Sequence, residues 1–216
     1  MMTTGIFTIH RQEINGVKLN EPIYLIPFGD IHRNSPLCHE EKWIEFLAWA
    51  KTKKNAYFLG MGDYDDMASA SERDILSNRH LHEATKDTLE NISKKFTDRL
   101  SKELSFMNGR LIGLLEGNHY SEFSNGTTST QRMCETLGCK YLGCNAFIRL
   151  ILKSNTKHNA SLAVDIFAHH GMGAARFSGG SIKRVEDMQS VALADIYLMG
   201  HDHRKSVATK SLLRLS

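Results

Sequence analysis

No segment of this 216-residue chain has the apolar length that a membrane span requires, and residues 1–16 lack the hydrophobic stretch of a signal peptide. The sequence also lacks internal repeats, low-complexity tracts and linkers rich in proline, glycine and serine. We therefore expect a cytoplasmic protein with no membrane-bound part, folded as a single domain over residues 1–216.

Two nucleotide-binding signatures are also missing. Neither G-x-x-x-x-G-K-[ST] nor G-x-G-x-x-G occurs, which disfavours a P-loop NTPase and a nicotinamide-dependent enzyme. The four cysteines contain no C-x-x-C pair, so a zinc ribbon or a thioredoxin-like site is disfavoured too. Reduced, partly buried thiols are the simpler interpretation.

The charge of the chain is only weakly positive, with a formal net charge of +3. This value is compatible with an anionic substrate but is too small to indicate nucleic-acid binding. Hydrophobic residues make up 41% of the chain and charged residues 24%, so the protein can bury a core of ordinary size.

Short apolar runs alternate with amphipathic stretches, which predicts an α/β fold. We expect strands at residues 23–28, 56–59, 111–115, 147–152, 162–168 and 196–199. We expect helices at residues 36–52, 83–107 and 181–194. At the start of the chain, residues 5–10 and 17–19 flank an Asn15-Gly16 turn signal and predict a β-hairpin.

The segment at about 67–109 is expected to be a helical insertion between a turn at residues 62–66 and a turn at residues 117–119. Its helix has an apolar stripe with spacings of three or four residues, made of Leu89, Ile92, Phe96, Leu100 and Leu104. Lysines and arginines on the same helix are interleaved with acidic residues, so a solvated mixed-charge face is a better interpretation than a polyanion-binding one.

Glycine-containing turns that carry Asp, Asn or His follow five of the predicted strands. In chain order, the motifs are Asp30-Ile31-His32, Gly62-Asp63-x-x-Asp66, Gly117-Asn118-His119, His169-His170-Gly171 and Gly200-His201-Asp202-His203. In α/β sheets, ligands bind at the carboxyl ends of the strands. Oxygen and imidazole ligands mixed in this way suit Mn²⁺, Fe²⁺, Zn²⁺ or Co²⁺.

The spacing inside the motifs also suits metal ligands. In Asp30-x-His32 and His201-x-His203, side chains two residues apart on an extended segment point the same way and can reach one site. The glycines allow the backbone to turn sharply and to come close to an ion. Each motif alone is a weak signal, but five in one order favour a joint site over scattered polar loop residues.

The ordered set D-x-H, G-D-x-x-D, G-N-H, H and G-H-x-H, from Asp30 to His203, resembles the pattern of the calcineurin-like metallophosphoesterases. The resemblance implies a four-layer α/β/β/α sandwich with a binuclear centre of two divalent ions, Mn²⁺ first and Fe, Zn or Co as alternatives. It implies seven metal ligands: Asp30, His32 and His203 on one ion, Asn118, His169 and His201 on the other, and Asp63 bridging both.

Three further roles follow from the same resemblance. The spacing of the family pattern favours His169 as the ligand and leaves His170 to face substrate or solvent. His119 would be the catalytic imidazole that protonates the leaving oxygen or stabilises charge on the phosphoryl group. Asp66 and Asp202 would orient ligands or loops.

Charge counting supports phosphoester hydrolysis at such a centre. Two divalent ions carry four positive charges and Asp30 and Asp63 return two negative ones, so the site would attract a phosphate ester. A bridging water, activated by the ions and by Asp63, would be the nucleophile. Arg33 and Asn34, just past the first motif, are candidates for substrate contacts together with His170.

Two departures from the family pattern indicate which branch of the metallophosphoesterases the sequence resembles. Protein Ser/Thr phosphatases of the family have an arginine where Met67 follows Asp66 and an acid where Tyr120 follows His119. The pattern therefore looks closer to the phosphodiesterase and nuclease branches. Only residues 204–216 follow the last motif, so we expect either an abbreviated fold or a fragment, with one further strand at 206–212.

The leading hypothesis is a metal-dependent phosphodiesterase or nuclease that acts on a phosphoester substrate, with nucleic acid among the candidates. The alternatives are a phosphomonoesterase for a small molecule, and a DNA-processing subunit that has little activity without a protein partner or a second copy of itself. A non-catalytic scaffold is disfavoured because Asp30 and His119 are both retained.

Overall fold

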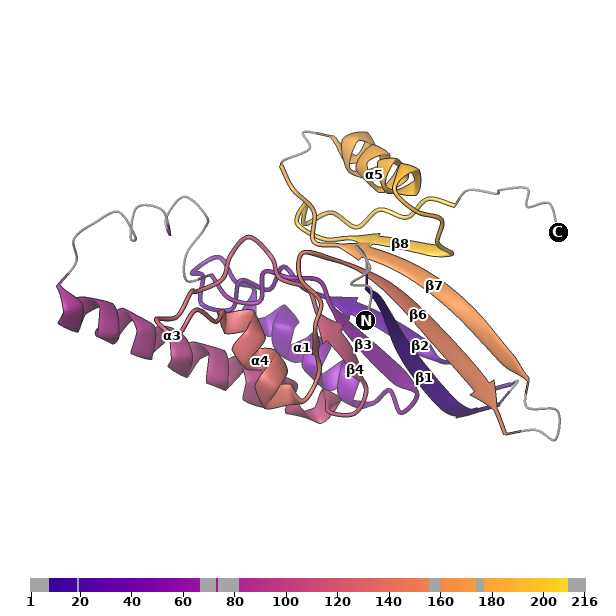
Figure 1. Cartoon of the computed structure of the whole chain (residues 1–216), viewed down its shortest axis with the longest axis horizontal. Helices are drawn as coiled ribbons and strands as arrows, with labels where there is room; N and C mark the ends of the chain where they lie inside the picture. Colours follow the sequence, from indigo (N-terminus) through magenta and orange to yellow (C-terminus); the bar gives the residue numbers. More distant parts are fainter. Residues whose placement is uncertain are drawn as a thin grey trace, which may run out of the picture.

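The computed structural model describes residues 8–18, 20–66, 73, 82–155, 160–173 and 177–209. It is a mixed α/β structure in which two four-stranded sheets lie between helices (Figure 1). Within the described ranges, no helix combines the length and the apolar character needed to cross a membrane.

One sheet is entirely parallel and has the strand order β2-β3-β4-β5. Its strands are β2 (Tyr24–Phe28), β3 (Ala56–Gly60), β4 (Leu111–Leu114) and β5 (Lys140–Tyr141). Each connection passes through a helix, as parallel strands require. The helical connections are α1 (Glu40–Lys51), α3 (Glu83–Leu104) with the short 3₁₀ helix η1 (Ser105–Met107), and α4 (Ser129–Leu137).

The other sheet is mixed and has the order β1-β6-β7-β8. Its strands are β1 (Ile9–Val17), β6 (Asn145–Ser154), β7 (Ser161–His169) and β8 (Ile196–Met199). Strands β6 and β7 are antiparallel, whereas β1 is parallel to β6 and β8 is parallel to β7. Helix α5 (Ser178–Asp187) and the 3₁₀ helix η2 (Met188–Ser190) connect β7 to β8 (Figure 1).

Apolar side chains fill the spaces between these elements in three clusters. The largest joins one face of the parallel sheet to α1, α3 and α4 and includes Phe58, Leu100 and Leu114, which are at most 1% exposed. The second, which includes Leu115 and Ile148, lies between the two sheets. The third is a small cluster between the mixed sheet and the α5–η2 segment.

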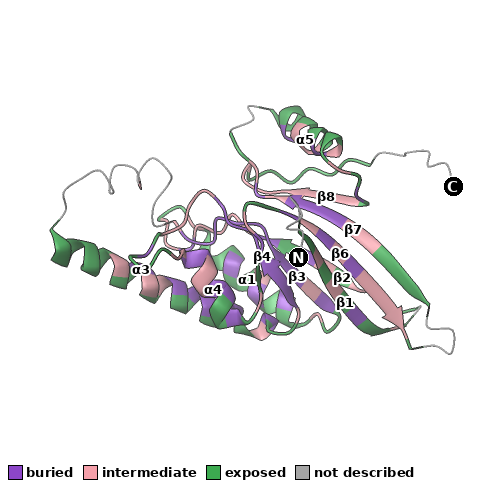
Figure 2. Cartoon of the chain, in the orientation of Figure 1, coloured by how far each residue is buried: buried purple, intermediate pink, exposed green. Residues whose placement is uncertain are grey.

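Only the second half of α3 packs on the body of the protein. Leu100 and Leu104 are buried, but Leu89 and Ile92 of the expected apolar stripe are 41% and 38% exposed. Figure 2 shows the same change along the helix, from an exposed first half to a partly buried second half. The apolar spacing therefore predicts the helix correctly but overstates how much of it is covered.

The strands expected from the apolar runs and the three expected helices are confirmed, with boundary shifts of a few residues. The expected N-terminal hairpin is wrong. Strand β1 runs straight through Asn15-Gly16 and pairs in parallel with β6, with a register shift at this point. Gly16 has a positive φ of 77°, so the glycine accommodates an irregularity inside a strand and not a hairpin turn.

Two elements were not expected from the sequence, α4 and the two-residue strand β5. Helix α4 begins with a capping box, in which Thr128 and Gln131 each accept a hydrogen bond from the other's backbone N–H. Residues 206–209 form no strand, and the remainder of the strand expected at 206–212 lies outside the described residues. So does most of the first part of the expected insertion at 67–109.

An arginine-centred cluster holds the loop after β2 against α1 and α3. The guanidinium of Arg33 is 7% exposed and donates to Glu103 through Nε (3.1 Å) and Nη2 (3.2 Å). Its Nη1 donates to Glu40 at 2.7 Å, and the indole Nε1 of Trp43 donates to Glu103 at 2.7 Å. Burial alone would raise the pKa of Glu103, but Arg33 and Trp43 outweigh it and lower the pKa.

We expect Arg33→Ala to lower the free energy of unfolding by about 2–3 kcal/mol, because the carboxylate of Glu103 loses its charged partner in a partly buried position. Arg132→Ala is the matched control. Arg132 also pairs with one carboxylate through two nitrogens, Asp98 at 2.8 and 2.9 Å, but that pair lies on the surface. The control should cost less than about 1 kcal/mol. Urea denaturation measures both, and equal costs would contradict this account of the buried cluster.

Candidate metal centre

The polar motifs from both sheets meet where their strands end. Asp30 follows β2, Asp63 follows β3, and Asn118 and His119 follow β4 in the parallel sheet. The mixed sheet contributes residues after β7 and β8, namely His170, His201 and His203. Carboxyl ends of strands are the usual place for a ligand site in α/β sheets, and here two sheets contribute to one such site.

Backbone hydrogen bonds connect the first two motifs directly. The N–H of Asp30 donates to the carbonyl of Gly62 at 2.9 Å. The carbonyl oxygen of Asp63 accepts from the N–H groups of both Ile31 and His32, at 2.8 and 3.1 Å. The turns after β2 and β3 therefore form one hydrogen-bonded unit, which fixes the relative positions of the side chains they carry.

Backbone strain is concentrated at the same residues. Among the described residues, all the non-glycine residues with positive φ are expected metal ligands: Asp30 (49°), His32 (47°), Asp63 (50°), His201 (71°) and His203 (50°). Asp and His tolerate the left-handed region better than most residues, but each still costs on the order of 1 kcal/mol. Strain of this kind persists where a precise side-chain arrangement is needed, which is typical of functional sites.

One group of donor atoms consists of Asp30, His32 and His203, whose ligand atoms lie within 4.8 Å of one another. The rings of His32 and His203 are stacked with centroids 5.2 Å apart. Both carboxylate oxygens of Asp30 accept from the backbone N–H of His201, at 3.0 and 2.9 Å. This set is the one expected for the first ion.

A second group contains Asp63, His170 and His201, again with donor atoms within 4.8 Å. Nδ1 of His170 donates to the carbonyl oxygen of Met61 at 2.8 Å, which leaves Nε2 directed at the polar side of the site. Nε2 lies 3.0 Å from Oδ1 of Asn118 and 3.3 Å from Oδ2 of Asp63. A histidine with one nitrogen on a backbone carbonyl and the other facing carboxylate and amide oxygens is arranged as a metal ligand.

The structure brings His170, and not the His169 that the resemblance favours, to the other candidate ligands. His169 is the last residue of β7, paired with Asn145 on one side and Met199 on the other. Its Nδ1 accepts the backbone N–H of Gly171 at 2.6 Å, and His169 joins none of the candidate metal groups of the described residues. His170, 3% exposed, takes the position at the site.

The carboxylate of Asp63, a member of the second group, also faces His32 of the first. Its Oδ2 is 3.6 Å from Nε2 of His32 and 3.3 Å from Nε2 of His170. Its Oδ1 accepts the backbone N–H of His119 at 2.9 Å. Asp63 is 2% exposed, so this carboxylate is buried between histidines of both groups.

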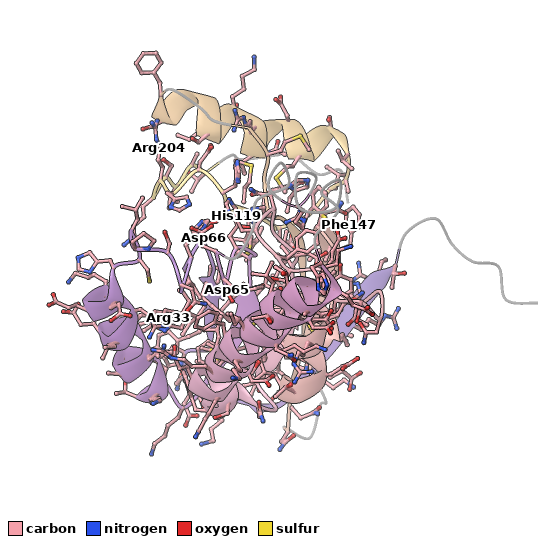
Figure 3. The ribbon with its side chains drawn as sticks, turned by 90° about the vertical axis from the view of Figure 1, so that its left-hand side faces the viewer. Arg33, Asp65, Asp66, His119, Phe147 and Arg204 are labelled. Carbon is pink, nitrogen blue, oxygen red and sulfur yellow. The ribbon has the colours of Figure 1, made fainter. Side chains whose placement is uncertain are left out.

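His119 is paired with Asp66. Nδ1 of His119 lies 2.6 Å from Oδ1 of Asp66, with angles outside those of a good hydrogen bond, and has no other hydrogen-bond partner among the described residues. The ring of His119 also packs edge-on against His32, with centroids 4.8 Å apart. Figure 3 shows Asp66 beside His119, with Arg33 away from both toward α1. The two side chains are therefore in direct contact.

Two glycines allow the motifs to come this close. A Cβ at Gly117 would overlap with Oδ1 and the backbone nitrogen of Asp63. A Cβ at Gly62, where φ is 101°, would lie 2.5 Å from Nδ1 of His170 and 2.8 Å from the Cα of Gly117. The glycines in these motifs are thus required by the close approach of the turns.

The acids and histidines of the site influence each other's pKa values. Burial raises the pKa of Asp63, but His170 and His119 outweigh burial and hold the pKa low. Burial would lower the pKa of His170, and Asp63 with the Met61 carbonyl raises it instead. The pKa of Asp30 is raised, mainly by burial. A divalent cation would satisfy the buried carboxylates and take the place of the proton on His170, so the donor set fits a metal.

Arg33 and Asn34, the expected substrate contacts, both have hydrogen-bond partners within the protein. Arg33 is buried and occupied by Glu40 and Glu103, as described above. Nδ2 of Asn34 donates to Oδ1 of Asp65 at 2.5 Å. Both side chains therefore hold the loop in shape.

Two further contacts support the site. Asp202 pairs with Arg184 of α5 at 3.2 Å, consistent with its expected role in orienting the last loop. The sequence analysis missed Arg73, whose Nη1 donates to the carbonyl oxygens of Asn118 and Tyr120 at 3.1 and 3.0 Å. Its guanidinium also lies 3.7 Å from the centre of the Tyr120 ring. No motif marks Arg73, because the residues it contacts lie more than 40 positions away.

Comparisons with models of protein families, with curated proteins and with solved structures gave no match to this chain. The residues of the site and their arrangement are therefore the basis on which a function can be proposed.

We expect the purified protein to bind Mn²⁺ with an affinity that depends on His170 and not on His169. His170→Ala should weaken binding at least about tenfold, because it removes a direct ligand. His169→Ala, a substitution of the same size one position away, should change it less than about threefold. Isothermal titration calorimetry measures both. The reverse order would restore His169 as the ligand.

Gly117→Ala should weaken Mn²⁺ binding strongly, since the added methyl group would push the Asp63 carboxylate out of place. Gly179→Ala is the control, because a Cβ at this α5 glycine has no heavy atom within 4 Å. Circular dichroism should show both variants folded. If Gly117→Ala bound Mn²⁺ like the control, the close approach would have no role in metal binding.

Proposed function

We propose that this protein is a phosphoester hydrolase that depends on two divalent metal ions, Mn²⁺ first and Fe²⁺, Zn²⁺ or Co²⁺ as alternatives. The observation that carries the proposal is the position of the Asp63 carboxylate, within 3.6 Å of a histidine from each of two three-residue donor groups. We further propose that the two sheets and their flanking helices form the four-layer α/β/β/α sandwich of the metallophosphoesterases. Three apolar clusters between successive layers support this architecture.

The residues divide into two ligand sets. Asp30, His32 and His203 would hold one ion, and Asn118, His170 and His201 the other, with Asp63 shared between them. When bound, the ions would polarise the phosphoryl oxygens and lower the pKa of a water molecule that attacks phosphorus. Four positive charges against the two carboxylates Asp30 and Asp63 leave a net positive site, which suits a phosphate ester.

His119 would supply the proton for the leaving oxygen. Its Nδ1 faces Asp66 at 2.6 Å, which leaves Nε2 as the atom that can hold a proton toward the substrate. Asp66 would fix the orientation of the ring. The backbone N–H of His119 also donates to Asp63, so the general acid and the shared ligand move as one unit.

A diester fits this site better than a monoester. A phosphomonoester carries a second negative charge, which the protein phosphatases of the family neutralise with an arginine that Met67 replaces here. The nearby Arg33 is occupied by Glu40 and Glu103. We therefore place the protein among phosphodiesterases, with nucleotide-containing diesters and nucleic acid as candidate substrates.

Hydrolysis of bis-p-nitrophenyl phosphate with Mn²⁺ tests the proposal. The wild-type protein should release p-nitrophenol, and EDTA should abolish the release. His119→Ala should lower kcat by about 10²–10⁴-fold while Mn²⁺ binding stays intact, because it removes the acid and not a ligand. His39→Ala is the control, since His39 caps α1 on the surface.

Two other results would contradict the proposal. Faster hydrolysis of p-nitrophenyl phosphate than of the diester would make the protein a phosphomonoesterase. No hydrolysis of either ester by protein shown to bind Mn²⁺ would reject hydrolysis by the chain alone.

A further inference from the structure

A pocket of about 760 Å³ opens directly beside the candidate metal centre. It runs along the free edge of β8, between α5 and the segment 202–209, and Asp30 and His203 form part of its wall. Figure 1 shows α5 above β8, with the chain after β8 returning between them. Any phosphoester bound at Asp30 and His203 would therefore place one of its substituents at the mouth of this pocket.

The walls of the pocket combine apolar and polar groups. Ile182 and Val185 of α5 line one side, and the edge of β8 from Ile196 to Met199 lines the other. Because β8 is the last strand of the described sheet, half of its backbone N–H and C=O groups point away from β7. Glu186 and Gln189 add polar side chains, and Arg204 and Lys205 add positive charge.

Ser181 gives an independent sign that the pocket is built for a ligand. The residue lines the pocket and is 5% exposed, and its Oγ has no hydrogen-bond partner among the described residues. A buried hydroxyl without a partner costs roughly 1–3 kcal/mol, so such groups usually have one. A polar group of a bound molecule would supply it.

These walls suit one kind of substituent. An alkyl chain would leave Ser181, Gln189 and the edge of β8 without partners, and a bare phosphate would leave Ile182 and Val185 uncovered. A heterocycle joined to a sugar offers apolar faces together with donors and acceptors at its edges. The volume lies within the range of roughly 300–1,000 Å³ that small-molecule sites have.

We propose that this pocket binds the nucleoside substituent of a phosphodiester substrate, an inference that rests on the hydrolase function proposed above. The preferred substrate is then a small nucleotide diester or a nucleotide at the end of a strand. Duplex DNA is disfavoured, because its stacked and paired bases cannot enter a pocket of this size without being unpaired.

The test compares two diesters that release the same p-nitrophenol, thymidine 5′-(p-nitrophenyl phosphate) and methyl p-nitrophenyl phosphate, in the presence of Mn²⁺. Only the first has a nucleoside that can reach the pocket. We expect kcat/KM for the thymidine ester to exceed that for the methyl ester at least about tenfold. Ile182→Trp, which fills the pocket, should remove this preference by raising KM for the thymidine ester alone.

Two further variants distinguish an effect on the pocket from a general loss of folded structure. Ser181→Ala leaves the pocket open and should lower the preference by about three- to fivefold, because one hydrogen bond is lost. Ile44→Trp adds the same indole on α1, where Ile44 is 60% exposed, and should leave both esters unaffected.

Binding of thymidine 5′-monophosphate, measured by calorimetry on the Mn²⁺-loaded protein, separates the two proposals. Binding that Ile182→Trp weakens, without hydrolysis of either ester, would keep the pocket and reject the hydrolase. Equal kcat/KM for both esters, unchanged or equally reduced in Ile182→Trp, would overturn the pocket and keep the hydrolase.

Discussion

The arrangement of the site depends on one residue, Asp63, whose backbone carbonyl and side-chain carboxylate both contact other motifs of the site. Its carbonyl accepts two N–H groups from the first motif, and its Oδ1 accepts the N–H of His119 from the third. Its Oδ2 faces His170 and His32, which come from different sheets. One buried aspartate therefore sets the distances among four of the five polar motifs. Its environment explains why glycines, and no larger residues, stand at 62 and 117.

This arrangement is kept at a cost in backbone energy. Five residues of the site adopt positive φ, at on the order of 1 kcal/mol each, and buried carboxylates add desolvation. The rest of the fold offsets this cost with three apolar clusters and with the Arg33–Glu103 pair that holds the loop after β2. The site thus lowers the stability of the folded state, and the packing elsewhere in the fold compensates for this loss. Such a balance is typical of sites where charge is concentrated.

The sequence predicts the strands well, because short apolar runs reflect local structure, and the polar turns that follow them come together at the ends of the strands. Prediction from the sequence fails where the structure of a segment depends on a contact with residues far away in the chain. The Asn15-Gly16 signal is read as a hairpin because the true partner of β1 is β6, about 138 residues away. Arg33 is taken as a substrate contact because Glu103, 70 residues later, cannot be paired with it from sequence. Spacing alone also cannot distinguish His169 from His170, since the choice depends on where β7 ends.

Because the site is shared between two sheets, metal binding would also hold the sheets together. The parallel sheet supplies Asp30 and Asp63, and the mixed sheet supplies His170, His201 and His203. Without an ion, the described contacts across this junction are charge pairs and hydrogen bonds, such as Asp63 with His170 and Asp30 with the backbone of His201. With the ions, each group of ligands would join residues of both sheets through short coordinate bonds. A ligand that binds only the folded state stabilises it by mass action, so bound metal ions would stabilise the contact between the two sheets.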